Sequence, residues 1–132
     1  MGEGRARLPF MNSDHLHDAA VIGAGPAGLV AALALARLGL DVAIVAPSAP
    51  GADPRTTALL GGSVDLLANL GCAAGIADAS EPLTGIRIVD DRGGILRAPE
   101  VLFRAAEIDA AQFGVNVLNT ALVAALWSRV LD

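Results

Sequence analysis

Three glycines near the start of the chain have the spacing of a nucleotide-binding turn. They form the pattern Gly23-x-Gly25-x-x-Gly28, directly after a short apolar stretch and directly before a long helical pattern. Gly23 permits a tight turn, Gly25 lets a pyrophosphate approach the backbone, and Gly28 lets the helix pack closely against the strands. The chemistry predicted is dinucleotide binding, with the phosphates facing the N–H groups and the positive dipole end of the helix.

The elements that must position this turn follow in order along the chain. We expect a strand over Ala19–Ile22, a helix from Pro26 to Leu38 that Gly39 ends, and a second strand over Val42–Val45. Pro26 and Ala27 lie in the first helical turn, where the missing N–H of proline is no loss. This order predicts an α/β fold with a Rossmann-like βαβ unit.

Two other interpretations apply to the same stretch. Residues 19–36 carry no charge, and an uncharged run of that length can indicate a membrane-spanning helix. Glycines and Pro26 interrupt this run early, and its strand-like and helix-like parts have different periods. A tight turn that binds nothing is the second alternative. The complete strand–turn–helix–strand context favours a nucleotide site over both.

Composition limits the classes of partner and compartment. The chain has 132 residues, 54% of them hydrophobic, which suits one domain with a real core. Its net charge of −5 gives no basic footprint for nucleic acid. Cys72 is the single cysteine, so an internal disulfide is excluded and a reducing compartment is favoured. Because residues 1–14 contain no apolar segment of signal-peptide type, we expect a cytoplasmic protein. Cys72 follows Gly71 at an expected helix end, and we expect it to be a passive buried thiol.

Several further elements are predicted along the chain. They are a disordered tail over 1–17, a helix over Pro54–Leu70 capped by Asp53 and ended by Gly71, an inserted β-hairpin of Thr84–Val89 and Ile95–Arg97 around a solvated turn at Asp90-Asp91, an extended segment at Phe103, and a helix capped by Asn119 or Asn116 that ends near Leu131.

No side chain suggests hydrolytic or metal chemistry. Ser63 lacks the G-x-S-x-G context of a nucleophile, and no cysteine or carboxylate cluster completes a metal site at His15-x-His17. We therefore predict no catalytic side chain and no metal.

Ala46 stands where many dinucleotide-binding proteins carry an acid. It follows the second strand at the spacing, about 20 residues beyond the glycines, where a carboxylate usually hydrogen-bonds the adenosine ribose. Asp53 lies further on and could replace that acid only if the loop folds back. This departure weakens the case for ordinary NAD.

The chain resembles the flavoprotein aromatic hydroxylases, and among them the ubiquinone-biosynthesis hydroxylases. The resemblance covers residues 18–128 and rests on the glycine turn together with four further segments: Asp53-Pro54-Arg55-Thr56-Thr57-Ala58-Leu59, Leu67-Ala68-Asn69-Leu70-Gly71, Ile86-Arg87-Ile88-Val89-Asp90 and Phe113-Gly114-Val115-Asn116-Val117-Leu118-Asn119. The arginine segment and the Phe-Gly segment are more specific than the glycine turn, which many flavoproteins share.

This resemblance implies FAD as cofactor, with the pyrophosphate on the turn at 23–28. It places Arg55 near the pyrophosphate and flavin, and Asn119, or less strongly Gln112, beside the flavin chain. For the parent enzyme it implies NAD(P)H and a polyprenyl phenol as reactants and a peripheral association with a membrane.

The departures from this family are as informative as the matches. A later Asp-Gly segment and a Gly-Asp flavin segment have no counterpart, since neither dipeptide occurs in the sequence. We therefore interpret 18–132 as the N-terminal part of an FAD-binding domain that is inactive alone and self-associates through exposed core. The alternatives are an NAD(P)-binding dehydrogenase or reductase domain and a non-catalytic fragment.

Overall fold

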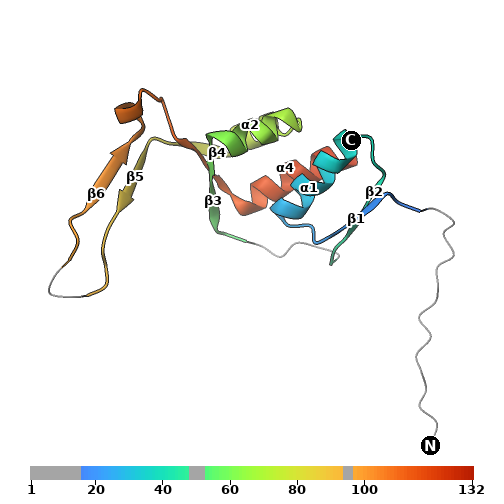
Figure 1. Cartoon of the computed structure of the whole chain (residues 1–132), viewed down its shortest axis with the longest axis horizontal. Coiled ribbons are helices and arrows are strands. Elements are labelled where there is room, and N and C mark those ends of the chain that lie inside the picture. The colour runs from blue at the N-terminus through green and yellow to red at the C-terminus, as the bar shows by residue number, and fades with distance from the viewer. Residues whose placement is uncertain (1–15, 48–52, 94–96) are drawn as a thin grey trace, which may run out of the picture.

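The computed structural model describes residues 16–47, 53–93 and 97–132. Its elements are β1 (Ala19–Ile22), α1 (Pro26–Arg37), β2 (Val42–Val45), β3 (Thr56–Leu60), α2 (Gly61–Asn69), α3 (Ala73–Ala77), β4 (Ser80–Leu83), β5 (Gly85–Ile88), β6 (Val101–Arg104), the 3₁₀ helix η1 (Ala105–Ile108), β7 (Gly114–Leu118) and α4 (Asn119–Leu131). Helices α1, α2 and α4 lie together in the middle, β1 and β2 lie at one end, and β5 and β6 project from the other (Figure 1).

The predicted βαβ unit is confirmed. β1 and β2 form a parallel pair from Ala19↔Val42 to Ile22↔Val45, and α1 connects them. Both strands have the predicted bounds, and α1 ends at Arg37 rather than Leu38. Gly39 ends the helix in the left-handed conformation, with φ of +83°, and its N–H donates to the Ala36 carbonyl at 2.9 Å.

The predicted helix over Pro54–Leu70 is wrong in its first part. Thr56–Leu60 forms strand β3, and α2 begins only at Gly61. The β-branched pair Thr56-Thr57 favours an extended backbone, and β3 pairs antiparallel with β7 from Thr56↔Leu118 to Leu60↔Gly114. β7 also pairs with β4, which makes it the central strand of a three-stranded sheet. Gly71, with φ of +84°, ends α2 as predicted.

Asp53 is therefore not a helix cap. Its carboxylate accepts the backbone N–H of Arg55 at 3.1 Å, in a turn that leads directly into β3. Such a side-chain bond two residues ahead is typical of aspartate in turns.

The hairpin prediction is right in its first strand and wrong in its second. β5 pairs with β6 from Gly85↔Arg104 to Ile88↔Val101, so the returning strand is Val101–Arg104. Of the expected strand Ile95–Arg97, Arg97 lies in no strand and the other two residues lie outside the described part. The extended segment expected at Phe103 is confirmed, since Phe103 pairs with Ile86 in this ribbon.

The Asp90 carboxylate is bound by several groups in the loop between these strands. Its carboxylate accepts the N–H groups of Arg92 at 3.3 Å and Ala98 at 3.1 Å, and it pairs with the Arg92 guanidinium at 2.9 Å. Only 12% of its side chain is exposed, so the prediction of a merely solvated turn is wrong for this residue.

Helix α4 has the predicted apolar face but not the predicted cap. Leu122 and Leu126 are buried and Val130 is half-buried, while the cap position is Leu118, with no side-chain hydrogen bond. Asn119 is the first helical residue and Asn116 lies within β7, because β7 runs straight into the helix.

The core lies where α1 and α4 pack against α2, α3 and the sheet of β3, β7 and β4. Its largest fully buried side chains are Leu29, Val117 and Leu126, one each from α1, β7 and α4. Cys72 is also buried there, and burial raises the pKa of its thiol, in keeping with the passive role predicted for it.

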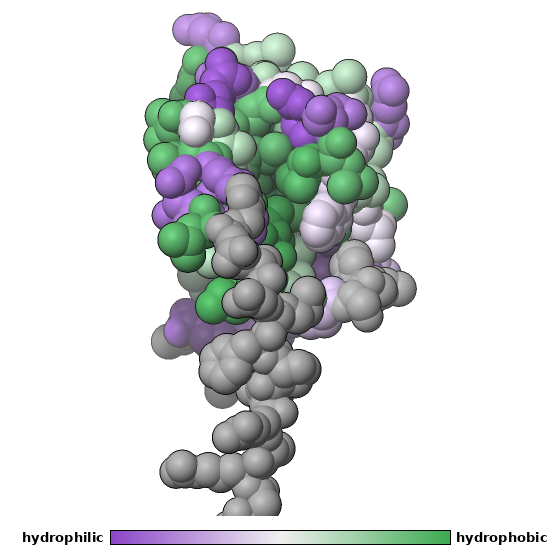
Figure 2. All heavy atoms as spheres, turned by 90° about the vertical axis from the view of Figure 1, so that its right-hand side faces the viewer, coloured by the Kyte–Doolittle hydropathy of each residue, from purple (hydrophilic) through white to green (hydrophobic). Residues whose placement is uncertain are grey.

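Apolar side chains are nevertheless exposed at the β1–β2 end. Ile22 and Val45, which pair in register on the two strands, are 87% and 56% exposed, and Leu38 is 77% exposed. Figure 2 faces this end and shows apolar surface between hydrophilic patches. Parallel strands normally have both faces covered. None of the helices within the described residues combines the length and apolarity needed to cross a bilayer.

Candidate functional site

The turn between β1 and α1 has the backbone geometry predicted from its glycines. Gly23 has φ of +110°, which side-chain-bearing residues rarely adopt, and its N–H donates to the Val45 carbonyl at 2.8 Å. That bond fixes the turn to the carboxyl end of β2. The tight-turn role predicted for Gly23 is therefore confirmed.

The fold excludes a side chain at position 28 but leaves space for one at position 25. A Cβ on Gly28 would lie 2.0 Å from the Gly23 carbonyl oxygen, so the helix can pack this closely only without a side chain. A Cβ on Gly25 would meet no heavy atom within 4 Å. The fold therefore needs glycine at 28, whereas at position 25 a side chain would fill open space in front of the turn.

That open space lies at the N-terminus of α1. Gly25 is the cap residue and makes no side-chain hydrogen bond, Pro26 is at the start of the helix, and the first turn contains no acid. The N–H groups of Ala27 and Gly28 belong to the first turn, where a helix offers them no internal partner. Together with the helix dipole they form a site suited to a phosphate.

Four polar side chains form a cluster where β3 and α4 begin. The Arg55 guanidinium donates to both carboxylate oxygens of Asp53, at 2.8 Å each, and Asn119 Nδ2 donates to Asp53 Oδ2 at 2.8 Å. Thr57 Oγ1 donates in turn to Asn119 Oδ1. The backbone N–H of Asn119 donates to the Arg55 carbonyl at 2.9 Å, so backbone and side chains both join β3 to α4. The structure thus brings together two predicted site residues, Arg55 and Asn119.

Asp53 and Thr57 are the members that sequence reasoning missed. Asp53 was expected as a helix cap or a distant ribose ligand, and Thr57 was assigned to a helix. The spacing Asp53-x-Arg55 was the available signal, because a carboxylate two residues before an arginine can reach its guanidinium across a turn. Thr57 could be found only after its strand was paired.

Asp53 and Arg55 each stabilise the ionised form of the other. The Arg55 guanidinium, and after it the Asn119 amide, hold the pKa of the Asp53 carboxyl well below its usual range. Asp53 in turn raises the pKa of Arg55. The Arg55 side chain is 80% exposed, and its bonds to Asp53 use only part of its donor set, so it remains accessible to an anion.

Helices α1 and α4 pack against each other and begin on the same side of the molecule. In Figure 1 both start toward β3 and run toward the end occupied by β1 and β2. The first turn of α4 contains no acid, like that of α1. The glycine turn and the Arg55–Asn119 cluster therefore belong to the same side of the fold. The partial positive charges of both helix starts lie there, while the Asp53 carboxylate offsets the charge of the guanidinium.

The family model described as FAD binding domain matches residues 17–127. The chain belongs to this FAD-binding family. The match covers the βαβ unit, the second sheet and most of α4, so the predicted cofactor, FAD, is confirmed at the level of the family.

Solved structures share the fold at low sequence identity. They include the flavin-dependent monooxygenase PieE in complex with FAD and substrate (22% identity, TM-score 0.69), p-nitrophenol 4-monooxygenase PnpA from Pseudomonas putida DLL-E4 (16%, 0.64) and CmlS, a flavin-dependent halogenase (27%, 0.58). These matches cover 89%, 86% and 89% of this chain but only 22%, 29% and 22% of the other chains. The chain thus spans less than a third of their length. Among curated proteins no sequence matches it.

The residues at the turn fit the pyrophosphate of FAD. The space beyond Gly25 is open, the start of α1 lacks a side-chain cap, and Arg55 is exposed and charged. No charged side chain belongs to the first turn of α1 to repel a phosphate. The roles of the individual residues toward FAD remain predictions.

At the position where a carboxylate usually binds the adenosine ribose, this chain departs from the usual pattern. Ala46 directly follows β2, beside the carbonyl of Val45 that binds Gly23, and it offers no carboxylate. The Asp53 carboxylate is engaged by Arg55 and Asn119, which argues against its use as a ribose ligand in this arrangement. The prediction that Ala46 faces the adenosine ribose stays a prediction.

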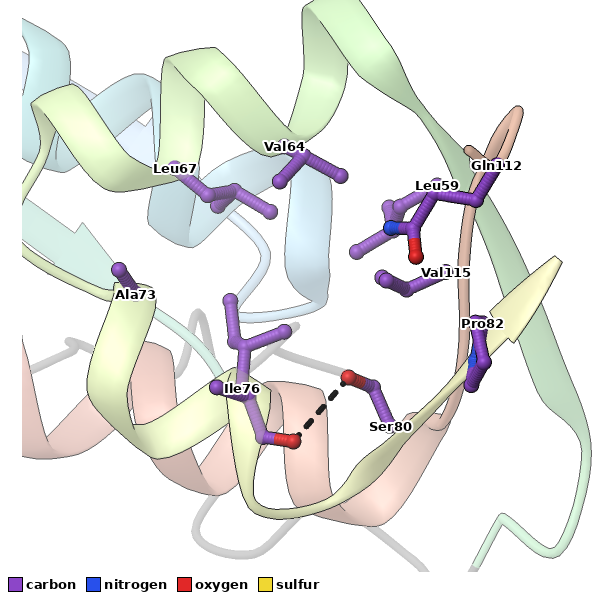
Figure 3. A pocket seen from close by; sticks show the side chains of 10 residues that line it. Leu59, Val64, Leu67, Ala73, Ile76, Ser80, Pro82, Gln112 and Val115 are labelled. Carbon is purple, nitrogen blue, oxygen red and sulfur yellow. Dashed lines mark hydrogen bonds between the residues drawn. The ribbon is translucent and has the colours of Figure 1, made fainter. Parts of the chain in front are cut away.

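Gln112 is not part of the Arg55–Asn119 cluster. It lies before β7 and lines a separate hollow of about 370 Å³ between α2, α3 and the second sheet (Figure 3). Its weaker prediction as a residue beside the flavin chain therefore gains no support from the geometry.

Proposed function

We propose that this chain is the N-terminal, FAD-binding part of a flavoprotein monooxygenase that hydroxylates a polyprenyl phenol in ubiquinone biosynthesis with NAD(P)H as reductant. The FAD-binding part of this proposal rests on the family match and on one observation: an open, uncapped helix start behind Gly25. The hydroxylase part rests on the resemblance of the arginine and Phe-Gly segments.

In this proposal the chain binds and orients the cofactor. The N–H groups at the start of α1 hold the pyrophosphate, and Arg55 donates to it as a permanently charged fork. Asn119 positions Arg55 indirectly, because both side chains contact the same Asp53 carboxylate. FAD, when bound, supplies the oxygen chemistry, and the protein supplies position and electrostatics.

The substrate part of the proposal concerns the whole enzyme rather than these residues alone. The chain spans less than a third of the solved structures that it matches, and the described residues provide no second flavin segment. We propose that this portion is inactive by itself and that a polyprenyl phenol and NAD(P)H bind to the parent enzyme, which associates peripherally with a membrane.

Titration of FAD against the purified chain tests the cofactor role. We expect saturable binding that NADP⁺ does not compete for, because the resemblance implies FAD in this turn. Gly25→Val should abolish binding, since the added side chain occupies the open phosphate space. Gly62→Val is the matched control: a Cβ there also meets nothing within 4 Å, but in α2. Equal FAD affinity in all proteins would contradict the assignment of the turn.

The ring-hydroxylation step needs a cellular test. In cells that lack a ubiquinone-ring hydroxylase, the gene region that encodes this chain, with its adjoining coding sequence, should restore ubiquinone. Continued accumulation of the unhydroxylated polyprenyl phenol would contradict this substrate while leaving the FAD assignment intact.

A further inference from the structure

A second concave site lies away from the glycine turn. It is formed where α2 and α3 face the sheet of β3, β7 and β4 (Figure 3). Two of the lining side chains, Ser80 and Gln112, are polar. The others are apolar: Leu59, Val64, Leu67, Ala73, Ile76, Ala77, Pro82 and Val115. Among the residues that the structure describes, no charged side chain lines this hollow, so its chemistry differs from that of the Arg55–Asn119 cluster.

The hollow is large enough for a small molecule. Its volume of about 370 Å³ lies within the usual range of ligand pockets. An apolar cavity of roughly 150 Å³ stays dry and holds benzene. The volume here is more than twice that, which leaves room for two fused or linked rings.

Two polar groups at the hollow can recognise one polar substituent. Figure 3 shows the Gln112 amide directed toward Leu59 and Val115. Gln112 is an exposed residue, and its amide makes no hydrogen bond to the described residues, so it is available to a ligand. It can both donate and accept. Ser80 Oγ donates to the Ala77 carbonyl at 3.3 Å, which leaves its oxygen able to accept. A ligand hydroxyl or carbonyl would therefore find a partner, whereas a phosphate or carboxylate would find no cation among the described lining residues.

We propose that this hollow binds a neutral two-ring aromatic molecule that carries a single hydroxyl or carbonyl group, at a site separate from that of FAD. The apolar walls from α2 and α3 hold the rings, and Gln112 binds the polar group. This goes beyond the proposed function, because no step of FAD binding uses these side chains.

Calorimetric titration of the whole chain with 2-naphthol tests the proposal. We expect saturable binding with one molecule per chain. In NMR spectra, the same titration should change the amide chemical shifts of α2, α3 and β7. Ala77→Leu places a larger side chain in the hollow and should weaken binding by about tenfold or more. Ala74→Leu is the matched control, since Ala74 lies in the same helix, is exposed and does not line the hollow.

The role of Gln112 is tested with naphthalene, which has the same rings and no hydroxyl. The wild-type chain should prefer 2-naphthol by about two- to tenfold, the usual range for one net hydrogen bond. Gln112→Leu should remove most of this preference, because only Ser80 Oγ then remains to bind the hydroxyl, while naphthalene affinity should not fall.

Three outcomes would overturn the proposal. One is equal 2-naphthol binding by the Ala77→Leu and wild-type chains. Another is competition between FAD and 2-naphthol, which would place both in one site. The third is self-association that Ala77→Leu abolishes in a chain that binds no naphthol, which would make a second copy the occupant. Gly25→Val separates the two sites, because it should remove FAD binding and leave 2-naphthol binding unchanged.

Discussion

Two alanine substitutions in the glycine turn should separate stability from cofactor binding. In Gly28→Ala, the new Cβ would lie 2.0 Å from the Gly23 carbonyl oxygen, although ordinary contacts begin at 3.4 Å. The start of α1 must therefore move away from the turn by more than an ångström. In Gly25→Ala, the new Cβ meets nothing within 4 Å, and the φ of −74° and ψ of 174° suit alanine.

The expected magnitudes follow from these contacts. Overpacking typically costs about 1–3 kcal/mol, and a Cβ only 2.0 Å from a backbone oxygen places Gly28→Ala at the upper end of that range. The helix propensity of alanine returns about 1 kcal/mol, so the unfolding free energy should fall by about 2 kcal/mol. For Gly25→Ala, the lower entropy of the unfolded chain raises the unfolding free energy by about 0.4–1 kcal/mol. Alanine is a poorer helix cap than glycine, which lowers the unfolding free energy by a similar amount. Its stability should change by less than about 0.5 kcal/mol.

Gly25→Ala should weaken FAD binding strongly although it leaves stability nearly unchanged. A methyl group in the phosphate space prevents charge-assisted hydrogen bonds worth about 1.5–3 kcal/mol each, so FAD affinity should fall by about 100-fold. Flavin fluorescence measures binding, and urea unfolding followed by the single tryptophan, the half-buried Trp127, measures stability. The reasoning is refuted if Gly25→Ala binds FAD as wild type does, or if Gly28→Ala unfolds at the wild-type urea concentration.

Four further predictions concern other residues and surfaces. Ala46→Glu should tighten FAD binding by about 0.5–1.5 kcal/mol through a ribose hydrogen bond, and an unchanged dissociation constant would mean that another group faces the ribose. Arg55→Gln should weaken FAD binding and reduce its dependence on salt, whereas an unaltered salt dependence would separate Arg55 from the phosphates. The Arg92 guanidinium and the Ala98 N–H lower the pKa of Asp90 to about 2. The stability that Asp90 contributes should therefore be present above its unfolded pKa of 3.8 and be lost as pH falls toward 2. Hydrogen exchange in β5 and β6 measures this loss, and Asp90→Asn should remove its pH dependence. The exposed apolar end at β1 and β2 should bind a hydrophobic dye and cause concentration-dependent self-association in sedimentation, and a monodisperse monomer that binds no dye would argue against it.

The sequence alone determined the βαβ unit and its turn. The signals for this unit are local: uncharged strands, glycines at fixed spacing, a proline at the helix start and Gly39 at its end. Each depends on the conformational range of the residue itself or of its near neighbours, so β1 and β2 could be predicted with their observed bounds. The same holds for the apolar face of α4, because a repeat of four residues needs no partner to be recognised.

Only the tertiary structure decided the second sheet and what it brings together. Thr56–Leu60 is a strand because β7, far along the chain, pairs with it, and no local pattern encodes that partner. The pairing then carries Asn119 to Asp53 and replaces the predicted helix cap with a polar cluster that includes Arg55. The hollow at Gln112 also depends on it, since its walls come from elements whose contacts form only on folding. Local conformational preference determined the nucleotide turn, and long-range pairing decided which side chains accompany it.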